Sequence, residues 1–373
     1  MKIAILTSSR ADYGIYRPLI KSLNNDPFFQ LSIVAFGTHL SAYHGYTIDE
    51  IERDGFTVNY KINSLLLTDD ENSMSTSTGL TTIKFAEFWE NHSKDFDWVF
   101  CLGDRFEMFA AVIAGLSYGV AFAHLHGGEA TLGAIDNFFR HSITLASKMH
   151  FVATTTFADK VRSIIGEEGD KDNIVVSGAL SLDNLAEIKL LSRNEFFTKW
   201  QIDLTIPSVL ITIHPETVNA KRNFKNLEEI IAVLVGLKDR YQLIITMPNV
   251  DTHGSIYRNA FETLGEKYPD NIKLIENFGT ESYFTCMNEA RFMLGNTSSG
   301  IIEAASFGKY VINIGDRQKG RLSGKNVFNV SINSKEIINC VSLVEGLKNE
   351  QFPNIYYNGG AVDKIIKKLK SIS

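Results

Sequence analysis

The sequence predicts an α/β protein built from two doubly wound, Rossmann-like domains that face each other across a cleft. Short apolar runs alternate with amphipathic segments along almost the whole chain, which is typical of parallel sheets with helices on both faces. The 373 residues exceed the ~250–300 at which a single core usually stops growing. With 44% apolar and 21% charged residues, the composition is that of an ordinary globular protein.

The apolar runs define the expected strands. In the first half we expect strands at residues 3–6, 31–36, 98–102, 120–125, 150–153 and 174–176. In the second half we expect strands at residues 209–213, 242–246, 272–275, 292–294 and 311–314. Helix-like stretches such as 225–237 and 281–288 lie between these runs.

The two halves meet near residues 177–184, where a strand, a glycine and a polar run follow one another. We therefore expect an N-terminal domain at 1–178 and a C-terminal domain at 179–359. The basic, amphipathic stretch 360–373 is expected to complete the N-terminal domain as a helix. Ligands of open α/β sheets bind outside the carboxyl ends of the strands, so the loops at those ends are the candidate sites.

Charge and cysteine content exclude several classes of protein. The net charge of -6 and the pI of about 5.9 argue against nucleic acid as a partner. Cys101, Cys286 and Cys340 lie far apart with no CxxC or zinc spacing, so a reduced, cytoplasmic chain is expected. The apolar stretch 108–125 is interrupted by Gly115 and other turn residues, which favours a helix, a turn and a strand over a membrane span.

The loop GNTSSG, residues 295–300, follows a predicted strand and opens a predicted helix. Free backbone N–H groups at a helix start favour a phosphate, so Ser298, Ser299 and Gly300 are candidate phosphate ligands. Simple N-capping by Ser298 or Ser299 explains the serines equally well. Glu303 lies four residues beyond Ser299, outside a standard capping box, and is available for a ribose hydroxyl.

The loop DRQKGRLSGK after the last predicted strand concentrates cations in an acidic protein. Arg317, Lys319, Arg321 and Lys325 fall within nine positions, and guanidinium groups match phosphate oxygens. A solvated charged loop is the alternative. Arg10 follows the first strand, where dinucleotide-binding proteins carry glycines, and we interpret it as a second cation for a pyrophosphate.

Three carboxylates follow strands of the first half: Asp104, Glu129 and Asp136. Carboxylates with differently tuned pKa values suit general acid–base catalysis. As alternatives, Asp104 forms a helix-capping pair with Glu107, and Asp136 forms an i, i+4 salt bridge with Arg140.

Histidines form a further group. His126 and His141 also fit as buried core histidines, whereas His214 precedes a proline that fixes its backbone and hence its side-chain direction. The sequence has no HExxH motif, no clustered His and Cys residues, and no DxD motif ahead of the phosphate-binding loops, so we expect neither a metal nor a cofactor.

Together and in order, several motifs resemble the hydrolysing UDP-N-acetylglucosamine 2-epimerases, on the fold shared with glycosyltransferase type B enzymes. The resemblance covers nearly the whole chain and is carried by TSSRADYG, GDRFE, HLHGGEATLGAIDNFFRHSIT, HPET, PNVDTHG, GNTSSGIIEA and INIGDRQKGR. It implies release of UDP and free N-acetylmannosamine, on the way to sialic-acid-type sugars.

The resemblance also implies roles for individual residues. The ligands of UDP that it implies are Arg10, His214, Asn249, Ser298, Ser299 and Arg317, with Glu303 on the ribose. The loop residues Gly300 and Arg321, singled out above, complete the expected set. The catalytic residues that the resemblance implies are Asp104, Glu129 and Asp136, with Arg105 and His141 near the sugar. From the residues themselves we add His214 as a catalytic residue and His126 as a ligand of the substrate. Non-hydrolysing relatives and animal bifunctional enzymes carry a glutamate in place of His126, so the role of that glutamate does not transfer.

Within this family, the motifs do not decide whether the sugar of the substrate is N-acetylglucosamine or N,N'-diacetylbacillosamine. The same motifs leave room for a non-hydrolysing epimerase, a UDP-sugar glycosyltransferase or a nucleotide-sugar sensor. We expect a homo-oligomer, either a dimer or a tetramer, that binds a UDP-sugar and neither a membrane nor nucleic acid.

Overall fold

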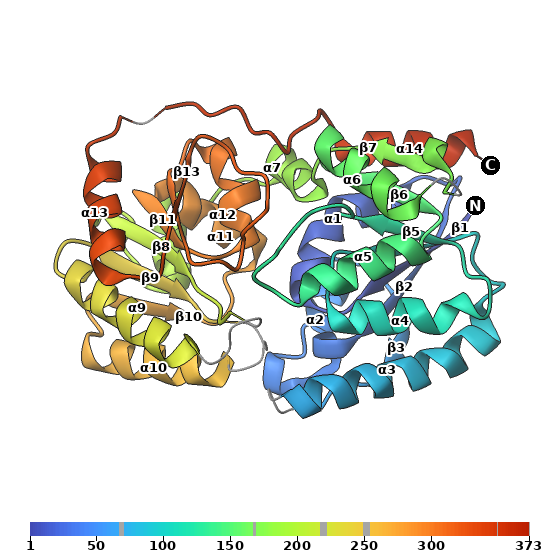
Figure 1. The fold of residues 1–373 in the computed structure, drawn as a ribbon, viewed down its shortest axis with the longest axis horizontal. Coiled ribbons are helices and arrows are strands. Elements are labelled where there is room, and N and C mark those ends of the chain that lie inside the picture. Colours follow the sequence, from blue (N-terminus) through green and yellow to red (C-terminus); the bar gives the residue numbers. More distant parts are fainter. Residues whose placement is uncertain (67–70, 167–168, 217–221, 249–253, 349, 373) are drawn as a thin grey trace. The chain divides into compact units, whose positions relative to one another are not determined.

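The computed structural model describes residues 1–66, 71–166, 169–216, 222–248, 254–348 and 350–372. The chain divides into two compact units. Unit 1 comprises Met1–Glu129, Asp136–Glu187 and Tyr356–Ser373, and unit 2 comprises Ala130–Ile135 and Ile188–Ile355. Each unit contains one parallel sheet (Figure 1).

Unit 1 has, among its described residues, a seven-stranded sheet in the order β3-β2-β1-β4-β5-β6-β7. The order reverses its direction at β1, as in a doubly wound sheet. The strands are β1 (Lys2–Thr7), β2 (Gln30–Phe36), β3 (Val58–Ile62), β4 (Trp98–Leu102), β5 (Phe122–Leu125), β6 (Met149–Val152) and β7 (Ile174–Val176). The helices are α1 (Arg10–Asn25), α2 (Ile48–Arg53), α3 (Glu71–His92), α4 (Phe106–Leu116), α5 (Asp136–Ala146), α6 (Thr155–Ile165), α7 (Asp183–Glu187) and α14 (Ala361–Ser371).

Both faces of this sheet are buried, because successive side chains along a strand point to opposite faces. In β1, Ile3 and Ile5 join one core with α1 and α14, whereas Ala4 and Leu6 join a second core with α3 and α4. Ile365 of α14 is part of the first core.

Unit 2 has, in the part that is described, a six-stranded parallel sheet in the order β10-β9-β8-β11-β12-β13. The strands are β8 (Ser208–Thr212), β9 (Gln242–Thr246), β10 (Ile272–Ile275), β11 (Phe292–Gly295), β12 (Val311–Ile314) and β13 (Val327–Val330). The helices are α8 (Arg193–Trp200), α9 (Asn223–Leu237), α10 (Gly254–Lys267), α11 (Gly279–Glu289), α12 (Ser298–Ile302) and α13 (Ser334–Glu345). Helices α9, α10 and α13 bury their apolar faces with β8 and β9 in one core.

The prediction of two parallel α/β sheets is confirmed, and each expected strand lies within two residues of an observed one. The apolar stretch 108–125 forms the end of α4, a turn and β5, as expected. Two edge strands, β3 and β13, were not predicted. Their side chains are only partly buried, so they lack the continuous apolar run that marks an inner strand. The expected domain bounds at 178 and 359 and the expected cleft stay predictions.

Candidate active site

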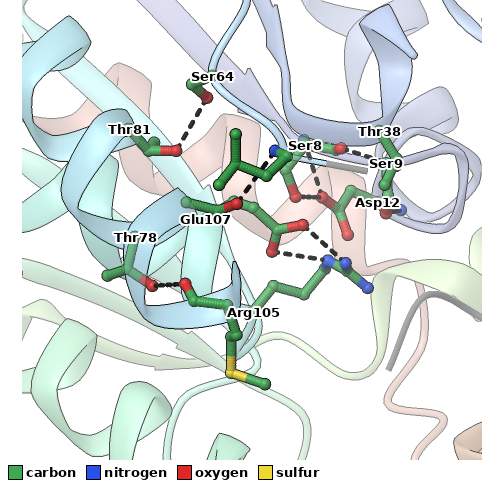
Figure 2. Close-up of polar contacts among 12 residues, drawn as sticks. Ser8, Ser9, Asp12, Thr38, Ser64, Thr78, Thr81, Arg105 and Glu107 are labelled. Carbon is green, nitrogen blue, oxygen red and sulfur yellow. Dashed lines mark hydrogen bonds and ion pairs between the residues drawn. The ribbon is translucent and has the colours of Figure 1, made fainter. Parts of the chain in front are cut away.

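The turn after β1 is held by a buried carboxylate that the sequence analysis did not single out. Asp12 accepts hydrogen bonds from the backbone N–H and hydroxyl of Ser8, at 2.9 and 2.6 Å (Figure 2). Ser9 caps α1 by accepting from the Asp12 N–H, and the Ser8 carbonyl accepts from Thr38. Arg10, the expected pyrophosphate ligand, is the first residue of α1 and therefore stands on a fixed turn.

Arg105 follows β4 and forms a two-point ion pair with Glu107, with N–O distances of 3.1 and 2.8 Å (Figure 2). The Glu107 side chain is 1% exposed and that of Arg105 20% exposed. Such a fork fixes the plane of the guanidinium group. Arg105 can therefore present a donor to a ligand only in the orientation that Glu107 allows.

Asp104 does not cap α4, which corrects the capping alternative. The helix begins at Phe106 with Arg105 at its N-cap and no side-chain capping bond. Asp104 instead pairs with Arg140 of α5, whose side chain is 1% exposed. Arg140 also donates to the Glu129 carbonyl at 2.9 Å, so one guanidinium group joins the loops that follow β4 and β5.

Glu129 is brought onto His126 by a tight turn after β5. The two side chains meet with 2.8 Å between Nδ1 and Oε1, and Glu129 is 1% exposed. Gly128 has φ +77, and a methyl group there would lie 2.3 Å from the Phe157 carbonyl oxygen, so only glycine fits. Both residues belong to the expected site, and the structure places them in direct contact.

His124 and His150 lie behind this turn on neighbouring strands. Burial lowers the pKa of His124 to about 3 and that of His150 to about 4. His124 contacts the Gly103 carbonyl and the Thr144 hydroxyl, at 2.9 and 3.1 Å. These two histidines are therefore neutral at physiological pH and add no charge behind Glu129.

Asp136 and His141 lie on the first turns of α5. Asp136 is its first residue, and His141 Nε2 lies 3.4 Å from the amide nitrogen of Asn137. Burial, followed by the neighbouring charge of Arg140, lowers the pKa of His141. The helix that carries Arg140 thus also carries both of these expected site residues.

In unit 2, the loop after β8 is joined to the loop after β11. The fully buried Asn296 accepts from the His214 N–H and donates to the His214 carbonyl, both at 2.8 Å. Gln318 donates to the Asn296 carbonyl at 2.8 Å. His214 is therefore fixed by a side-chain clamp as well as by the proline that follows it.

Hydrogen bonds connect the basic loop after β12 to the loop after β8. Glu216 accepts from the Asp316 N–H at 2.7 Å, and Arg317 donates to the Pro215 carbonyl at 3.3 Å. His214 and Arg317, two expected UDP ligands, are thus carried by loops in direct contact. Glu216 was missed because an acidic side chain beside expected phosphate ligands has no sequence signature.

The basic residues of that loop divide into two kinds. Arg317 and Arg321 are partly buried, and Arg321 donates to the Gln318 side chain at 2.9 Å. Lys319 and Lys325 are exposed, which fits the solvated alternative for those two. The sequence predicted one cationic cluster. In the structure its two arginines are partly buried, whereas its two lysines are exposed.

The segment Ala130–Ile135 packs on this basic loop. Leu132 donates to the Lys319 carbonyl at 2.9 Å, and a methyl group at Gly133 would lie 2.0 Å from the Asp316 carbonyl oxygen. Glu129 and Asp136, which flank the segment, belong to unit 1.

The expected phosphate loop is not capped by Ser298 or Ser299, which corrects the capping alternative. Thr297, and not Ser298 or Ser299, is the N-cap of α12, and its hydroxyl accepts from the Ser299 N–H at 3.4 Å. The Tyr283 phenol of α11 lies beside Ser299 and Glu303, and burial raises its pKa to about 12. Tyr283 therefore joins the candidate ribose and phosphate residues, although its sequence context did not mark it.

Asn249, an expected UDP ligand, lies outside the described residues. Among those that are described, no group of three or more His, Cys, Asp or Glu side chains could hold a metal ion.

A model of the UDP-N-acetylglucosamine 2-epimerase family matches residues 21–370. The chain is 36% identical over 332 residues to a Campylobacter jejuni protein named GDP/UDP-N,N'-diacetylbacillosamine 2-epimerase (hydrolyzing), covering 89% of this chain and 85% of that protein. It is 33% identical over 375 residues to the Legionella pneumophila UDP-N,N'-diacetylbacillosamine 2-epimerase (hydrolyzing), covering 100% of this chain and 96% of that protein.

The structure resembles the crystal structure of UDP-GlcNAc 2-epimerase from Neisseria meningitidis bound to UDP-GlcNAc. The TM-score is 0.80 at 18% identity, over 100% of both chains. At that identity the likeness supports the fold.

The chain belongs to the UDP-N-acetylglucosamine 2-epimerase family. The two relatives described above are named as hydrolysing 2-epimerases of a UDP-sugar, and the chain is an enzyme of this class. None of the helices in the described part of the chain has both the length and the apolar character that a membrane span needs.

Proposed function

We propose that this enzyme converts UDP-N-acetylglucosamine and water into UDP and free N-acetylmannosamine. The observation that carries the proposal is the buried cluster at the ends of β4 and β5, where Arg140 joins Asp104 to the Glu129 loop. It supplies two carboxylates and a fixed cation on one rigid sheet edge, as general acid–base catalysis requires.

Inversion at C2 of the sugar is difficult because that hydrogen is not next to a carbonyl group. Departure of UDP from C1 solves the problem: the C1–O bond breaks, its electron pair leaves with UDP, and the remaining positive character at C1 acidifies the C2 hydrogen. A carboxylate takes that proton and leaves a 2-acetamidoglucal. Water then adds at C1 while a second group protonates C2 from the opposite face.

We assign the binding of the diphosphate and the proton transfers to different residues. In unit 2, Arg317, His214 and the loop with Ser298, Ser299 and Gly300 would hold the diphosphate, with Glu303 on the ribose and Arg321 beside Arg317. Preorganised donors stabilise the departing anion without reorganisation during the reaction. In unit 1, Arg10 adds a cation, and Asp104, Glu129 and Asp136 carry the proton transfers, with Arg105 and His141 near the sugar.

UDP-N,N'-diacetylbacillosamine is the second candidate substrate, because both bacterial relatives described above are named for it. This sugar carries a 4-acetamido group and lacks the 6-hydroxyl group. Assay of both UDP-sugars side by side, with kcat/KM as the readout, decides between them.

Product analysis tests the proposed reaction. NMR of the products should show UDP together with a free 2-acetamido sugar of inverted configuration at C2. A nucleotide-linked product would indicate a non-hydrolysing epimerase, transfer to an added acceptor a glycosyltransferase, and binding without UDP release a sensor. Each of these results contradicts the proposal.

Asp104→Asn and Glu129→Gln test the assigned roles. Both variants should lose turnover by about 10²–10⁴-fold while UDP affinity, measured by calorimetry, stays within about threefold. Equal loss of UDP binding would show that the two carboxylates are structural.

We further propose that the enzyme works in the cytoplasm as a homodimer or homotetramer. Light scattering of the purified protein checks the oligomeric state, and a monomeric mass would contradict it.

A further inference from the structure

His126 has contacts that its expected place among the substrate ligands does not explain. Its Nδ1 lies 2.8 Å from Oε1 of Glu129, and the two side chains are 11% and 1% exposed. The other ring nitrogen, Nε2, is buried and has no hydrogen-bond partner in the described part of the chain. The hydrogen bonding of this ring is thus directed at the carboxylate.

The backbone of the turn holds the pair in this geometry. His126 has φ +63, a left-handed conformation in which histidine is enriched over most other residues, and its N–H donates to the Phe151 carbonyl at 3.0 Å. Gly127 and Gly128 follow, and a methyl group at Gly127 would lie 3.0 Å from the His124 ring. The turn is therefore closely packed, and it brings the Glu129 carboxyl group into contact with His126.

The chemistry of the pair defines which atom carries the proton. An ionised carboxylate only accepts hydrogen bonds, so Nδ1 donates and carries a proton. The contact with Glu129 therefore uses Nδ1 as the donor, and the buried Nε2 takes no part in it.

Other titratable and charged groups lie around the turn that carries Glu129. Arg140 reaches the Glu129 carbonyl from α5 and pairs with Asp104 of the β4 loop. His124 on β5 and His150 on β6 lie behind and are neutral. The hydrogen bond between His126 and the Glu129 carboxylate has a length of 2.8 Å, and both side chains are largely buried.

We propose that His126 is a positioning residue for Glu129 and not a ligand of the UDP-sugar. The His126 ring fixes the direction of the Glu129 carboxylate. By donating from Nδ1, it also favours the ionised form of this buried carboxylate, which acts as the proton acceptor. This inference rests on the proposed function, in which Glu129 transfers a proton during epimerisation.

Two substitutions separate the hydrogen bond from the backbone conformation. His126→Gly adopts positive φ freely and removes the donor. His126→Asn also tolerates positive φ, and its amide N–H can take the place of Nδ1–H. The control is His92→Ala, because His92 and Asp95 form an i, i+3 pair with the same 2.8 Å distance at an exposed position.

The wild-type enzyme and the three variants are compared in kcat, KM and the pH–rate profile. His126→Gly should lower kcat by about 10²-fold, the cost of a misplaced catalytic group, with KM within about threefold of wild type. Its acid limb should move to higher pH, because loss of a donor disfavours the carboxylate. His126→Asn should restore kcat to within about tenfold of wild type, and His92→Ala should match wild type.

Three results would overturn the proposal: a kcat for His126→Gly within about threefold of wild type, a change confined to KM, or a failure of His126→Asn to exceed His126→Gly. If the wild-type chain releases no UDP from either sugar, the proposed function fails and a second measurement still decides the inference. ¹⁵N NMR of labelled histidine should show His126 with its proton on Nδ1, and Glu129→Gln should shift that signal while leaving His92 unchanged. A proton on Nε2 with a bare Nδ1 would contradict the inference whatever the activity.

Discussion

Arg140 offers the sharpest test of how the proposed acid–base cluster is built. Its side chain is 1% exposed, and it joins the Asp104 carboxylate to the Glu129 carbonyl. Arg140→Met keeps most of the side-chain volume but removes the charge and every donor. Asp104 and the Glu129 loop then lose the group that connects them.

The expected size of the effect follows from burial. Removing one partner of a buried ion pair costs about 3–5 kcal/mol. The Asp104 side chain is 23% exposed, so water can partly replace the lost partner, and we expect the lower figure, about 3 kcal/mol. In a unit of about 200 residues this corresponds to a fall in Tm of about 6–12 °C.

Circular dichroism melts and urea titrations measure this loss, with kcat measured in parallel. Arg162→Met is the matched control, because Arg162 and Asp159 form an exposed pair in the same unit, where the loss should stay below about 1 kcal/mol. The double variant Asp104→Asn/Arg140→Met should be more stable than the sum of the single losses implies. A melt for Arg140→Met that coincides with the control, or strictly additive losses, would refute the reasoning.

Three further predictions concern the loops and the pH dependence. Gly133→Ala places a methyl group 2.0 Å from the Asp316 carbonyl oxygen, so it should weaken UDP binding in calorimetry, while Gly79→Ala, in open space on α3, should not; equal affinities would contradict this. Glu216→Gln removes the charge from the carboxylate that accepts from the Asp316 N–H, and UDP affinity should fall by about 3–10-fold; an unchanged Kd would show that the loop does not need it. Burial lowers the pKa of His39 to about 4, so the folded state resists protonation and stability is lost as pH falls from about 6.5 towards 4, by up to about 3 kcal/mol; urea midpoints for His39→Gln should depend less on pH, and an unchanged slope would count against the assignment.

The inner strands were predictable because both faces of a parallel sheet are buried, which produces continuous apolar runs such as β8. The edge strand β3 has alternating, half-exposed side chains and carries no such signal. The position of the loops relative to the sheet followed from the strand order, so the residues after β1, β4, β5, β8, β11 and β12 could be singled out in advance.

The partners of those residues could not be predicted, because they depend on contacts between distant segments. Local spacing suggested Asp136 as a partner of Arg140, and it could not show that the fold also pairs Arg140 with Asp104, 36 residues away. The side chains of Asn296 and Glu216 form hydrogen bonds to backbone groups of other loops, and such contacts leave no periodic pattern.

The central claim is that UDP leaves the anomeric carbon before C2 is inverted, and the reaction in D₂O tests it most directly. If a proton is removed from C2 and returned from solvent, every molecule of free product should carry one deuterium at C2, with UDP released in equal amount. Inverted product that retains its original hydrogen at C2 would contradict the account.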